Sequence, residues 1–401
     1  FFDLPTDETL VWRHHTLADD DIEHINERRR PENKIGFALQ LCALRYPGRL
    51  LSSGEVIPEK VLRFIAAQLG LTGDDILPYA ARRQTRQQHL QALRQIYGFK
   101  MFSGQGARSL TTWLAYEAET ARSNEDLARR FVEECRRSQV ILPGISVIER
   151  LCADALVSAE RRIESRIAAK LDGQTKDQLD ALLTEIVDGN VTRFIWLRRF
   201  EAGSNSAGAS RLLDRLEFLR DLCLSPDILA DVPPHRVTRL RRQGERYFAD
   251  GLRDITSDRR LAILAVCAVE WKAAIADAVI ETHDRIVGKT WRDAKRLSDA
   301  RIADARSSLR ETLRSFKDLG AALLEAKADG ASLDAAVEVA CGWSHLESMV
   351  TTAAELTDTM AADALSHVVH GYHRFRRYAP RMLRALDICA APVAAPLIQA
   401  T

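Results

Sequence analysis

The sequence predicts an all-α protein built from several helical domains with helix-turn-helix-like modules. Glycine and proline are sparse, with 20 and 12 copies in 401 residues, and long segments contain neither. Apolar residues make up 46% of the chain and charged residues 28%, the composition of a globular protein with a buried core. In most segments the apolar side chains recur with helical spacing. These observations exclude a largely disordered chain and a fibrous one.

Several classes of protein are excluded by simple patterns. No stretch approaches the ~20 uninterrupted apolar residues of a membrane-spanning helix. The first residues lack the basic region and apolar core of a secretory signal. The seven cysteines are scattered and never form C-x-x-C, which argues against a disulfide framework or a zinc site. We therefore expect a cytoplasmic protein without a metal or other cofactor in these residues.

The helices expected before residue 140 follow from their end signals. Asp19–Asp21 open a helix that closes on Arg28–Arg30, so both ends suit the helix dipole. Asn33 is expected to cap a nearly all-apolar helix that Pro47 and Gly48 stop. The helices that follow are expected after Pro58 up to Gly70, around 73–81, over 83–97, from Ser103 or Ser109 through Tyr116, and after a capping box at 123–126.

Beyond residue 140 the pattern is again helix after helix. Helices are expected over 145–171, 176–188, 191–199, 210–222, 234–251, 258–286, 290–328 and within 333–389. Residues 202–210 (AGSNSAGAS) have the composition of a flexible linker. We accordingly predict domains at 1–140, 141–205, 206–290 and 291–401. The last would be a long-helix region for linkage or dimerisation.

The distribution of charge favours a nucleic-acid partner even though the net charge is only +1. Of 57 basic residues 47 are arginine, whose planar fork suits phosphate and guanine, although the codon bias of a GC-rich genome would have the same effect. No acidic residue occurs between Asp75 and Glu117, a stretch that holds five arginines and Lys100. Such a basic stretch inside a folded segment is typical of a phosphate-binding face.

Residues 82–100 (RRQTRQQHLQALRQIYGFK) are the most informative segment. The first two turns of the predicted helix are rich in Arg and Gln, and the last two carry apolar anchors. A recognition helix is built this way, because Arg reads guanine and Gln reads adenine in the major groove. A turn at 70–74 before it fits a helix-turn-helix arrangement. The alternative is a solvated helical face with ordinary charges.

Three other basic clusters are weaker. Arg28–Arg30 would be favourable at a helix end in any case. The 234–251 helix places His235, Arg239, Arg242 and Arg246 on one face that could track phosphates. Together, the candidate DNA contacts are Arg28, Arg29, Arg30, Lys34, Arg45, Arg82, Arg83, Arg86, Gln87, Gln88, His89, Arg94, Lys100, Arg236, Arg239, Arg242 and Arg246. The third cluster, around Arg161, has acidic neighbours and reads as a solvated face.

No catalytic or metal site is predicted. Gly288-Lys289-Thr290 resembles the end of a phosphate loop, but position 283 is His and no strand precedes it. His367, His370 and His373 would spread around a helix, with no carboxylate or thiol to complete a zinc site.

The chain resembles the Tn3 family of replicative transposases. The likeness is carried by RRRPENKIGFALQLCALRYPGR at 28–49, and it continues through ILPGISVIERLCADA, VPPHRVTRLRRQGERYFADGLRDI and YHRFRRYAPRMLRAL. It implies an N-terminal, all-helical region that binds the terminal inverted repeats of a transposon, with 1–140 as the DNA-binding domain and 141–205 and 206–290 as further modules along the duplex. The whole protein would act on double-stranded DNA as a homodimer in the cytoplasm, at the bacterial nucleoid.

The resemblance also implies strand transfer by a DDE carboxylate triad that uses magnesium, in the C-terminal half of the family's proteins. The chain ends at 390–401 before any such segment, so no catalytic residue and no magnesium ligand is carried over, and we expect an N-terminal fragment of a longer transposase. Two alternatives stay open. One is a helical interaction or regulatory module without a DNA role, and the other is a self-contained nuclease.

Overall fold

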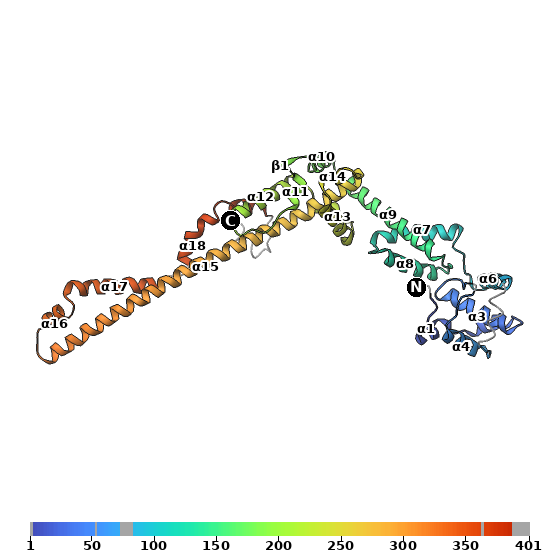
Figure 1. The fold of residues 1–401 in the computed structure, drawn as a ribbon, viewed down its shortest axis with the longest axis horizontal. Helices are drawn as coiled ribbons and strands as arrows, with labels where there is room; N and C mark the ends of the chain where they lie inside the picture. Colours follow the sequence, from blue (N-terminus) through green and yellow to red (C-terminus); the bar gives the residue numbers. More distant parts are fainter. Residues whose placement is uncertain (1–2, 53, 73–82, 362–364, 387–401) are drawn as a thin grey trace. The chain divides into compact units, whose positions relative to one another are not determined.

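Helices account for almost all of the regular structure, as predicted. The computed structural model describes residues 3–52, 54–72, 83–361 and 365–386, and within them the only sheet is one short hairpin (Figure 1). The chain forms two compact units. The first comprises residues up to 171 together with 229–240 and 256–262, and the second comprises 172–228, 241–255 and the residues from 263. The 73–81 helix and Arg82 lie outside the described residues.

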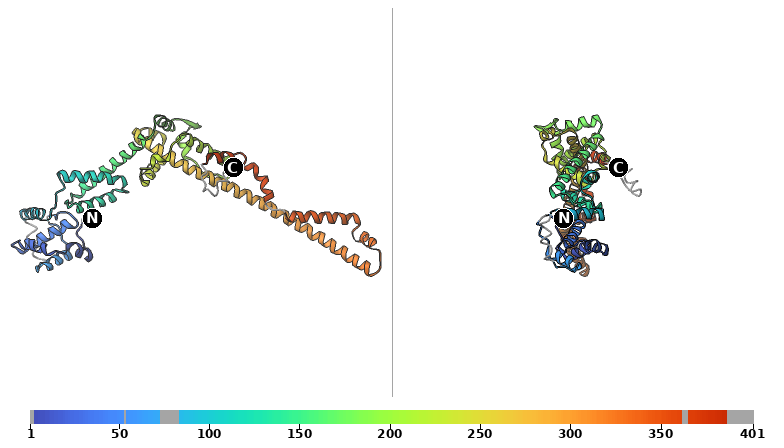
Figure 2. Two further views of the ribbon diagram at one scale, coloured as in Figure 1. Left: turned by 180° about the vertical axis from the view of Figure 1, so that it is seen from behind. Right: turned by 90° about the vertical axis from the view of Figure 1, so that its right-hand side faces the viewer.

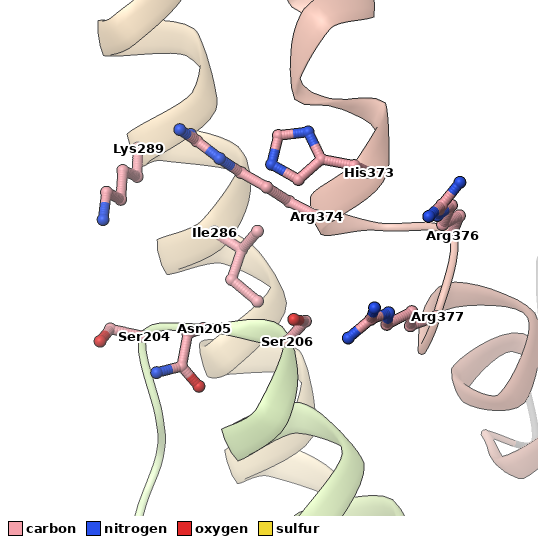
Figure 3. A pocket seen from close by; sticks show the side chains of 9 residues that line it. All are labelled: Ser204, Asn205, Ser206, Ile286, Lys289, His373, Arg374, Arg376 and Arg377. Carbon is pink, nitrogen blue, oxygen red and sulfur yellow. The ribbon is translucent and has the colours of Figure 1, made fainter.

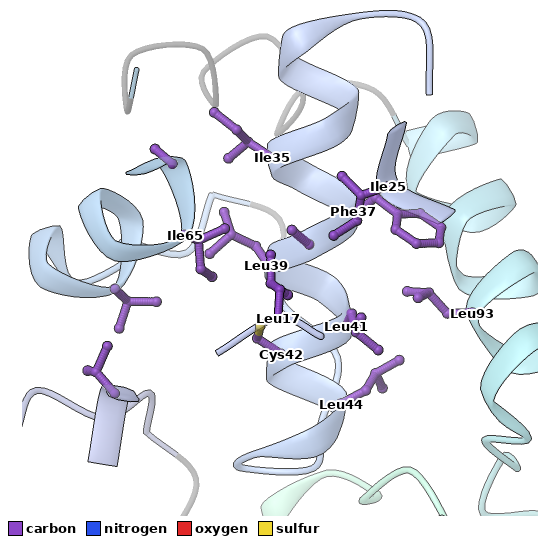
Figure 4. Packing of buried hydrophobic residues seen from close by; sticks show 14 of the residues in the cluster. Leu17, Ile25, Ile35, Phe37, Leu39, Leu41, Cys42, Leu44, Ile65 and Leu93 are labelled. Carbon is purple, nitrogen blue, oxygen red and sulfur yellow. The ribbon is translucent and has the colours of Figure 1, made fainter. Parts of the chain in front are cut away.

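The first half of the first unit surrounds a single buried helix. Its helices are α1 (Glu8–His15), α2 (Asp19–Asn26), α3 (Pro31–Arg45), α4 (Glu59–Gln68) and α6 (Arg83–Tyr97). Ten consecutive residues of α3, Ile35 to Leu44, are buried, as expected of a helix that is apolar on all sides. Figure 4 shows α3 with α6 on one side and α4 on the other. This core sets which side of α6 remains at the surface.

The remaining helices of this unit are α7 (Gly104–Thr120), α8 (Asn124–Arg137) and α9 (Ile145–Ala169), which share a second core around Leu114, Phe131 and Cys152. The Ser123 cap of α8 is confirmed, since its hydroxyl accepts from the Asp126 amide at 3.1 Å. The reciprocal bond of a capping box does not form, because the Asp126 carboxylate accepts from the Arg122 amide at 3.0 Å and not from the Ser123 amide. The end of α4 is confirmed too, because Gly70 adopts a φ of +67°, which favours glycine.

Two predicted helix boundaries were wrong. The helix α2 ends at Asn26, so Arg28–Arg30 lie in the connection to α3 and not in a last helical turn. The helix α3 begins at Pro31 with Arg30 as its N-cap, because proline is favoured at the first helical position, and Asn33 is inside the helix.

The second unit starts with α10 (Gly173–Ala181), β1 (Ile186–Asp188), β2 (Val191–Thr192), α11 (Arg193–Arg198) and α12 (Ser206–Asp221). The prediction of a helix over 176–188 was therefore wrong after Ala181. The chain turns through Gly189, whose φ is +59°, and the β-branched residues on both sides pair as an antiparallel hairpin.

The helices that follow are η2 (Pro226–Leu229), α13 (Pro234–Arg246), α14 (Ala249–Arg253) and α15 (Ser257–Ala328). A break between 286 and 290 was predicted, and this was wrong because α15 runs through it as one helix of 72 residues. One glycine within a helix costs only ~1 kcal/mol relative to alanine, so Gly288 does not end α15.

The chain ends its described part with α16 (Leu333–Ala340), α17 (Trp343–Ala361), α18 (Leu365–Val368), η3 (Val369–Arg374) and α19 (Ala379–Ala385). Within the second unit, α16 and α17 turn back along the end of α15 (Figures 1 and 2). The segment 202–210, expected to be a flexible linker, is packed: Gly203 donates from its amide to Thr282 Oγ1 on α15 at 2.8 Å, and Asn205 caps α12.

Candidate nucleic-acid interface

The helix α6 has one side in the core and the other at the surface. Leu93 is fully buried, and His89 packs edge-on against Phe37 of α3 with ring centroids 5.2 Å apart. The residues on the opposite side, at helical spacing, are exposed: Arg83, Gln84, Gln87, Gln88, Gln91 and Arg94. This exposed face of α6 is rich in the Arg and Gln side chains that can bond to phosphates and base edges.

The charges on this face are not neutralised by neighbours. Among the described residues, no carboxylate lies within ion-pair distance of Arg83, Arg86, Arg94 or Lys100. Arg94 donates from its Nε to the carbonyl of Phe99 at 3.4 Å, which leaves its charge uncompensated. A duplex would therefore meet cations that lose no internal ion pair on binding.

A hollow of about 210 Å³ lies beside the face. Arg83, Arg86 and Gln87 line it together with Gln40 of α3. The Nε of Arg86 is buried and has no hydrogen-bond partner among the described residues. A buried donor of this kind favours an acceptor from outside the chain.

The connection between α2 and α3 adds two exposed arginines near the start of α6. The contacts Phe37–His89 and Arg45–Tyr97 show that α3 and α6 run side by side in the same direction. Arg29 and Arg30, which directly precede α3, therefore lie towards the N-terminal end of α6, and both are exposed.

Three other candidates near Arg29 have internal partners. Arg30, although exposed, pairs with Glu32 at 3.7 Å. The guanidinium of Arg28 lies 4.8 Å from the centre of the Phe37 ring and pairs with Glu27 at 2.8 Å. Lys34 is half-buried and donates from its Nζ to Asn26 Oδ1 at 2.9 Å. The side chains of Arg28 and Lys34 reach the surface only in part.

Arg45 belongs to the interior network and not to an open surface. Its guanidinium donates two hydrogen bonds of 2.7 Å to Asp21, whose side chain is 2% exposed, and the Tyr97 hydroxyl donates a third at 2.9 Å. Burial alone would raise the pKa of Asp21, but bonds from Arg45, the Ala18 amide and Tyr97 hold that pKa below its usual value. Arg45 is therefore left out of the interface proposed below.

His89 is also corrected, because its side chain is only 4% exposed. Burial, with a smaller contribution from the nearby Arg28, lowers its pKa to about 4, so the ring is neutral at physiological pH. The sequence placed His89 among the basic turns, but its position, four residues before Leu93, points it into the core.

The basic helix α13 is divided between two roles. Arg236 is 4% exposed and donates to the carbonyls of Ala118 at 2.7 Å and Ala121 at 3.3 Å, and it pairs with Glu160 at 3.2 Å. Arg239 pairs with the same Glu160 carboxylate. Arg236 thus fastens α13 to α7 and α9 within the first unit and is not available to a duplex.

Arg242 and Arg246 belong to the second unit. Both are exposed, and no described carboxylate lies within ion-pair distance of either.

Lys100 of the first unit also has an exposed side chain. Its backbone amide and carbonyl form hydrogen bonds of 2.8 Å with the 139–141 segment.

The sequence reasoning missed one cationic site in the second unit. Lys289, Arg374, Arg376 and Arg377 line a hollow there with the start of α12. The available signal was the pair Arg376-Arg377, which has no acidic residue within several positions on either side.

Comparisons with known proteins were made over the whole chain. A family model described as a domain of unknown function (DUF4158) matches residues 1–155. The transposase for transposon Tn3926 of Escherichia coli is 34% identical over 99% of this chain and 40% of its own length. The transposase for Tn501 of Pseudomonas aeruginosa is 31% identical over the same shares, and that for Tn1546 of Enterococcus faecium is 27% identical over 100% and 41%.

The chain is related to the Tn3-family transposases. It spans about 40% of the length of the curated relatives that it matches. The resemblance that the sequence motifs indicated is thus confirmed over nearly every residue of this chain.

The described residues contain neither a membrane-spanning helix nor a metal-binding cluster. No helix in that part of the chain is both long and apolar enough to cross a membrane. Within the same residues, no group of three or more His, Cys, Asp or Glu side chains is placed to hold a metal ion.

Proposed function

We propose that this chain is the DNA-recognition part of a Tn3-family transposase and binds the terminal inverted repeats of its transposon. The exposed face of α6 carries the proposal, because its Arg and Gln side chains have no carboxylate partner among the described residues. Arg83, Gln87 and Gln88 would contact bases or phosphates, and Arg29, Arg30, Arg94 and Lys100 would contact phosphates.

We propose that Arg28, Lys34 and Arg86 have supporting roles, because each is half-buried next to the face. Arg242 and Arg246 would contact the backbone from the second unit. No cofactor is proposed for these residues, since the magnesium-dependent DDE chemistry of the family cannot be carried over onto them. The setting would be the cytoplasm, on nucleoid DNA.

The test is a binding titration with matched duplexes. The wild-type chain should prefer the terminal inverted repeat over a scrambled duplex of equal length, and the affinity should fall steeply with salt. Arg83→Ala with Gln87→Ala should weaken binding to the repeat at least ~10-fold and binding to the scrambled duplex much less, since a good base contact is worth ~1–3 kcal/mol.

The control is Arg150→Ala with Gln105→Ala, which removes the same side-chain types from exposed positions of the first unit outside α6. It should leave the preference for the repeat unchanged. If the α6 variant loses the same affinity for both duplexes, the exposed face of α6 contributes only non-specific electrostatic attraction. No binding by the wild type would favour the interaction-module alternative, and cleavage of DNA with magnesium would favour the nuclease.

We also propose that two copies associate through the helices at the end of the second unit. Apolar side chains are exposed on α15, α16 and α17, among them Leu324 at 71%, Val339 at 89%, Trp343 at 50% and Val350 at 55%. A second copy with the same surface would remove these side chains from water.

A further inference from the structure

A hollow of about 320 Å³ in the second unit is lined mainly by cations and small polar groups (Figure 3). Lys289 of α15, Arg374 of η3, and Arg376 and Arg377 from the segment after η3 contribute the charges. Ile286 forms an apolar wall, and residues 204–206 at the start of α12 close another side. Three stretches far apart in the sequence thus meet at this hollow, and two of them carry its positive charges.

Only a small part of this charge is neutralised within the chain. Arg374 pairs with Asp293 at 2.9 Å and donates to Thr290 Oγ1 at 3.3 Å, which fixes its position. In the described residues, no other ion pair involves a side chain that lines the hollow. Lys289, Arg376 and Arg377 therefore keep uncompensated charges, and Figure 3 shows the Arg377 side chain pointing towards Ser206.

The start of α12 adds donors to the same space. Asn205 is the N-cap, and its Oδ1 accepts from the Gly208 amide at 2.8 Å. The other amides of a first helical turn have no acceptor within the helix, and the positive end of the helix dipole lies there. The hydroxyls of Ser204 and Ser206 are further donors at the edge of the hollow.

The walls are held rigidly in place. Gly371 lies so close to α15 that a Cβ at this position would overlap the Thr290 side chain. The Tyr378 hydroxyl is 3.0 Å from His283 Nδ1, and Arg381 pairs with Glu217 of α12 at 2.7 Å. The segment that carries Arg376 and Arg377 is thereby fastened to both α12 and α15, so contacts within the chain hold the walls of the hollow together.

We propose that this hollow binds a phosphate group of the DNA backbone. Several uncompensated cations, free amides and hydroxyls around a small cavity match the charge and the acceptors of a phosphodiester. The Gly288-Lys289-Thr290 sequence thus contributes its lysine from within a helix and not from a phosphate loop. The inference rests on the proposed function and adds a further point of contact, distant in sequence from α6 and from Arg242 and Arg246.

The test compares two double variants that remove the same charges. Lys289→Gln with Arg377→Gln changes the hollow, and Lys295→Gln with Arg306→Gln changes exposed positions of α15 outside it. The hollow variant should bind both the inverted repeat and a scrambled duplex ~10-fold more weakly at 0.1 M salt, and its log–log salt slope should be smaller by ~1–2. The α15 control should keep the wild-type slope, and thermal melting should be unchanged in both variants.

The outcomes separate this inference from the proposed function. If the wild type binds no duplex, the proposed function fails first. If the wild type binds and the hollow variant keeps its affinity and slope, the inference is overturned. A thermal-shift experiment with inorganic phosphate at constant ionic strength tests whether the hollow binds free phosphate instead of a DNA phosphate. Suppose that phosphate raises the melting temperature of the wild type but not of the hollow variant, while both bind the duplex equally well. The hollow would then be a site for free phosphate, and the proposal that it binds a DNA phosphate would be overturned.

Discussion

At the scale of single residues, the basic side chains of the first unit fall into two groups: those that form an ion pair with a carboxylate and those that do not. Arg45 at the end of α3 and Arg83 at the start of α6 were both predicted DNA contacts. Arg45 is held by the buried Asp21, whereas Arg83 is exposed and has no carboxylate partner among the described residues. The first is a structural arginine, and the second is available to a ligand.

This difference predicts opposite responses to mutation. Arg45→Gln should lower the free energy of unfolding by ~3 kcal/mol, because it leaves the Asp21 carboxylate buried without its charge partner. Arg83→Gln should change it by less than ~0.5 kcal/mol, as is usual for exposed side chains. Chemical denaturation of both variants measures this, and equal stability would show that the Asp21–Arg45 pair contributes little.

Two buried histidines predict a pH dependence of stability. Burial lowers the pKa of His15 and of His89 to about 4, with smaller contributions from His14 and Arg28 respectively. Between pH 6.5 and about 4 the unfolded chain binds a proton at each histidine that the folded chain does not bind. Stability should therefore fall as the pH falls through this window, by ~1.4 kcal/mol per pH unit for each histidine.

The variant His15→Leu checks this directly. His15 is fully buried, and neither ring nitrogen has a partner among the described residues. Urea denaturation from pH 4 to pH 7.5 should give the variant a shallower dependence of stability on pH than the wild type. Parallel curves would mean that His15 does not titrate in this way.

At the scale of elements, the direction in which a helix packs decides which of its residues can reach DNA. The helix α6 lies along α3 with Leu93 inward, so Gln87 and Gln88 face solvent while His89 faces Phe37. The same rule separates Arg236, which is buried, from the exposed Arg242. An alternation of this kind cannot be assigned until the partner helix is known.

The contact between η3 and α15 is an element-scale feature that can be tested. Gly371→Ala should destabilise the chain by ~1–3 kcal/mol, because the new Cβ would overlap Thr290 Cγ2. Adding Thr290→Ser removes that methyl group and keeps the hydroxyl that accepts from Arg374, so it should restore most of the loss. A double-mutant cycle from thermal melts measures the coupling, and additive effects would contradict the proposed close contact.

At the scale of the whole molecule, each of the two compact units carries its own cationic surface. The first has the exposed face of α6, and the second has the hollow at Lys289. The units do not coincide with the four domains expected from sequence, because the unit boundaries fall within α13 and α15. The segment 202–210, where the sequence suggested a linker, lies inside the second unit.

The proposed association of two copies belongs to this scale. Sedimentation at micromolar concentration should give a dimer for the wild type and a monomer for Trp343→Ser with Val350→Ser. Trp12→Ser with Val56→Ser removes equally exposed side chains of the same types from the first unit and should remain dimeric. A wild-type monomer at every concentration tested would exclude this interface for the chain.

The sequence by itself determined the helical class, the Ser123 cap of α8, the buried nature of α3 and the relationship to the Tn3-family transposases. These features depend on local residue spacing and on long motifs, and both can be read from the sequence of a single chain. Only the tertiary structure decided that Arg45 pairs with the buried Asp21, that Arg236 and His89 are buried, and that Lys289 and Arg377 line one hollow. Each of these depends on partners 24 to 118 positions away or on packing against another helix, and local spacing holds no information about either.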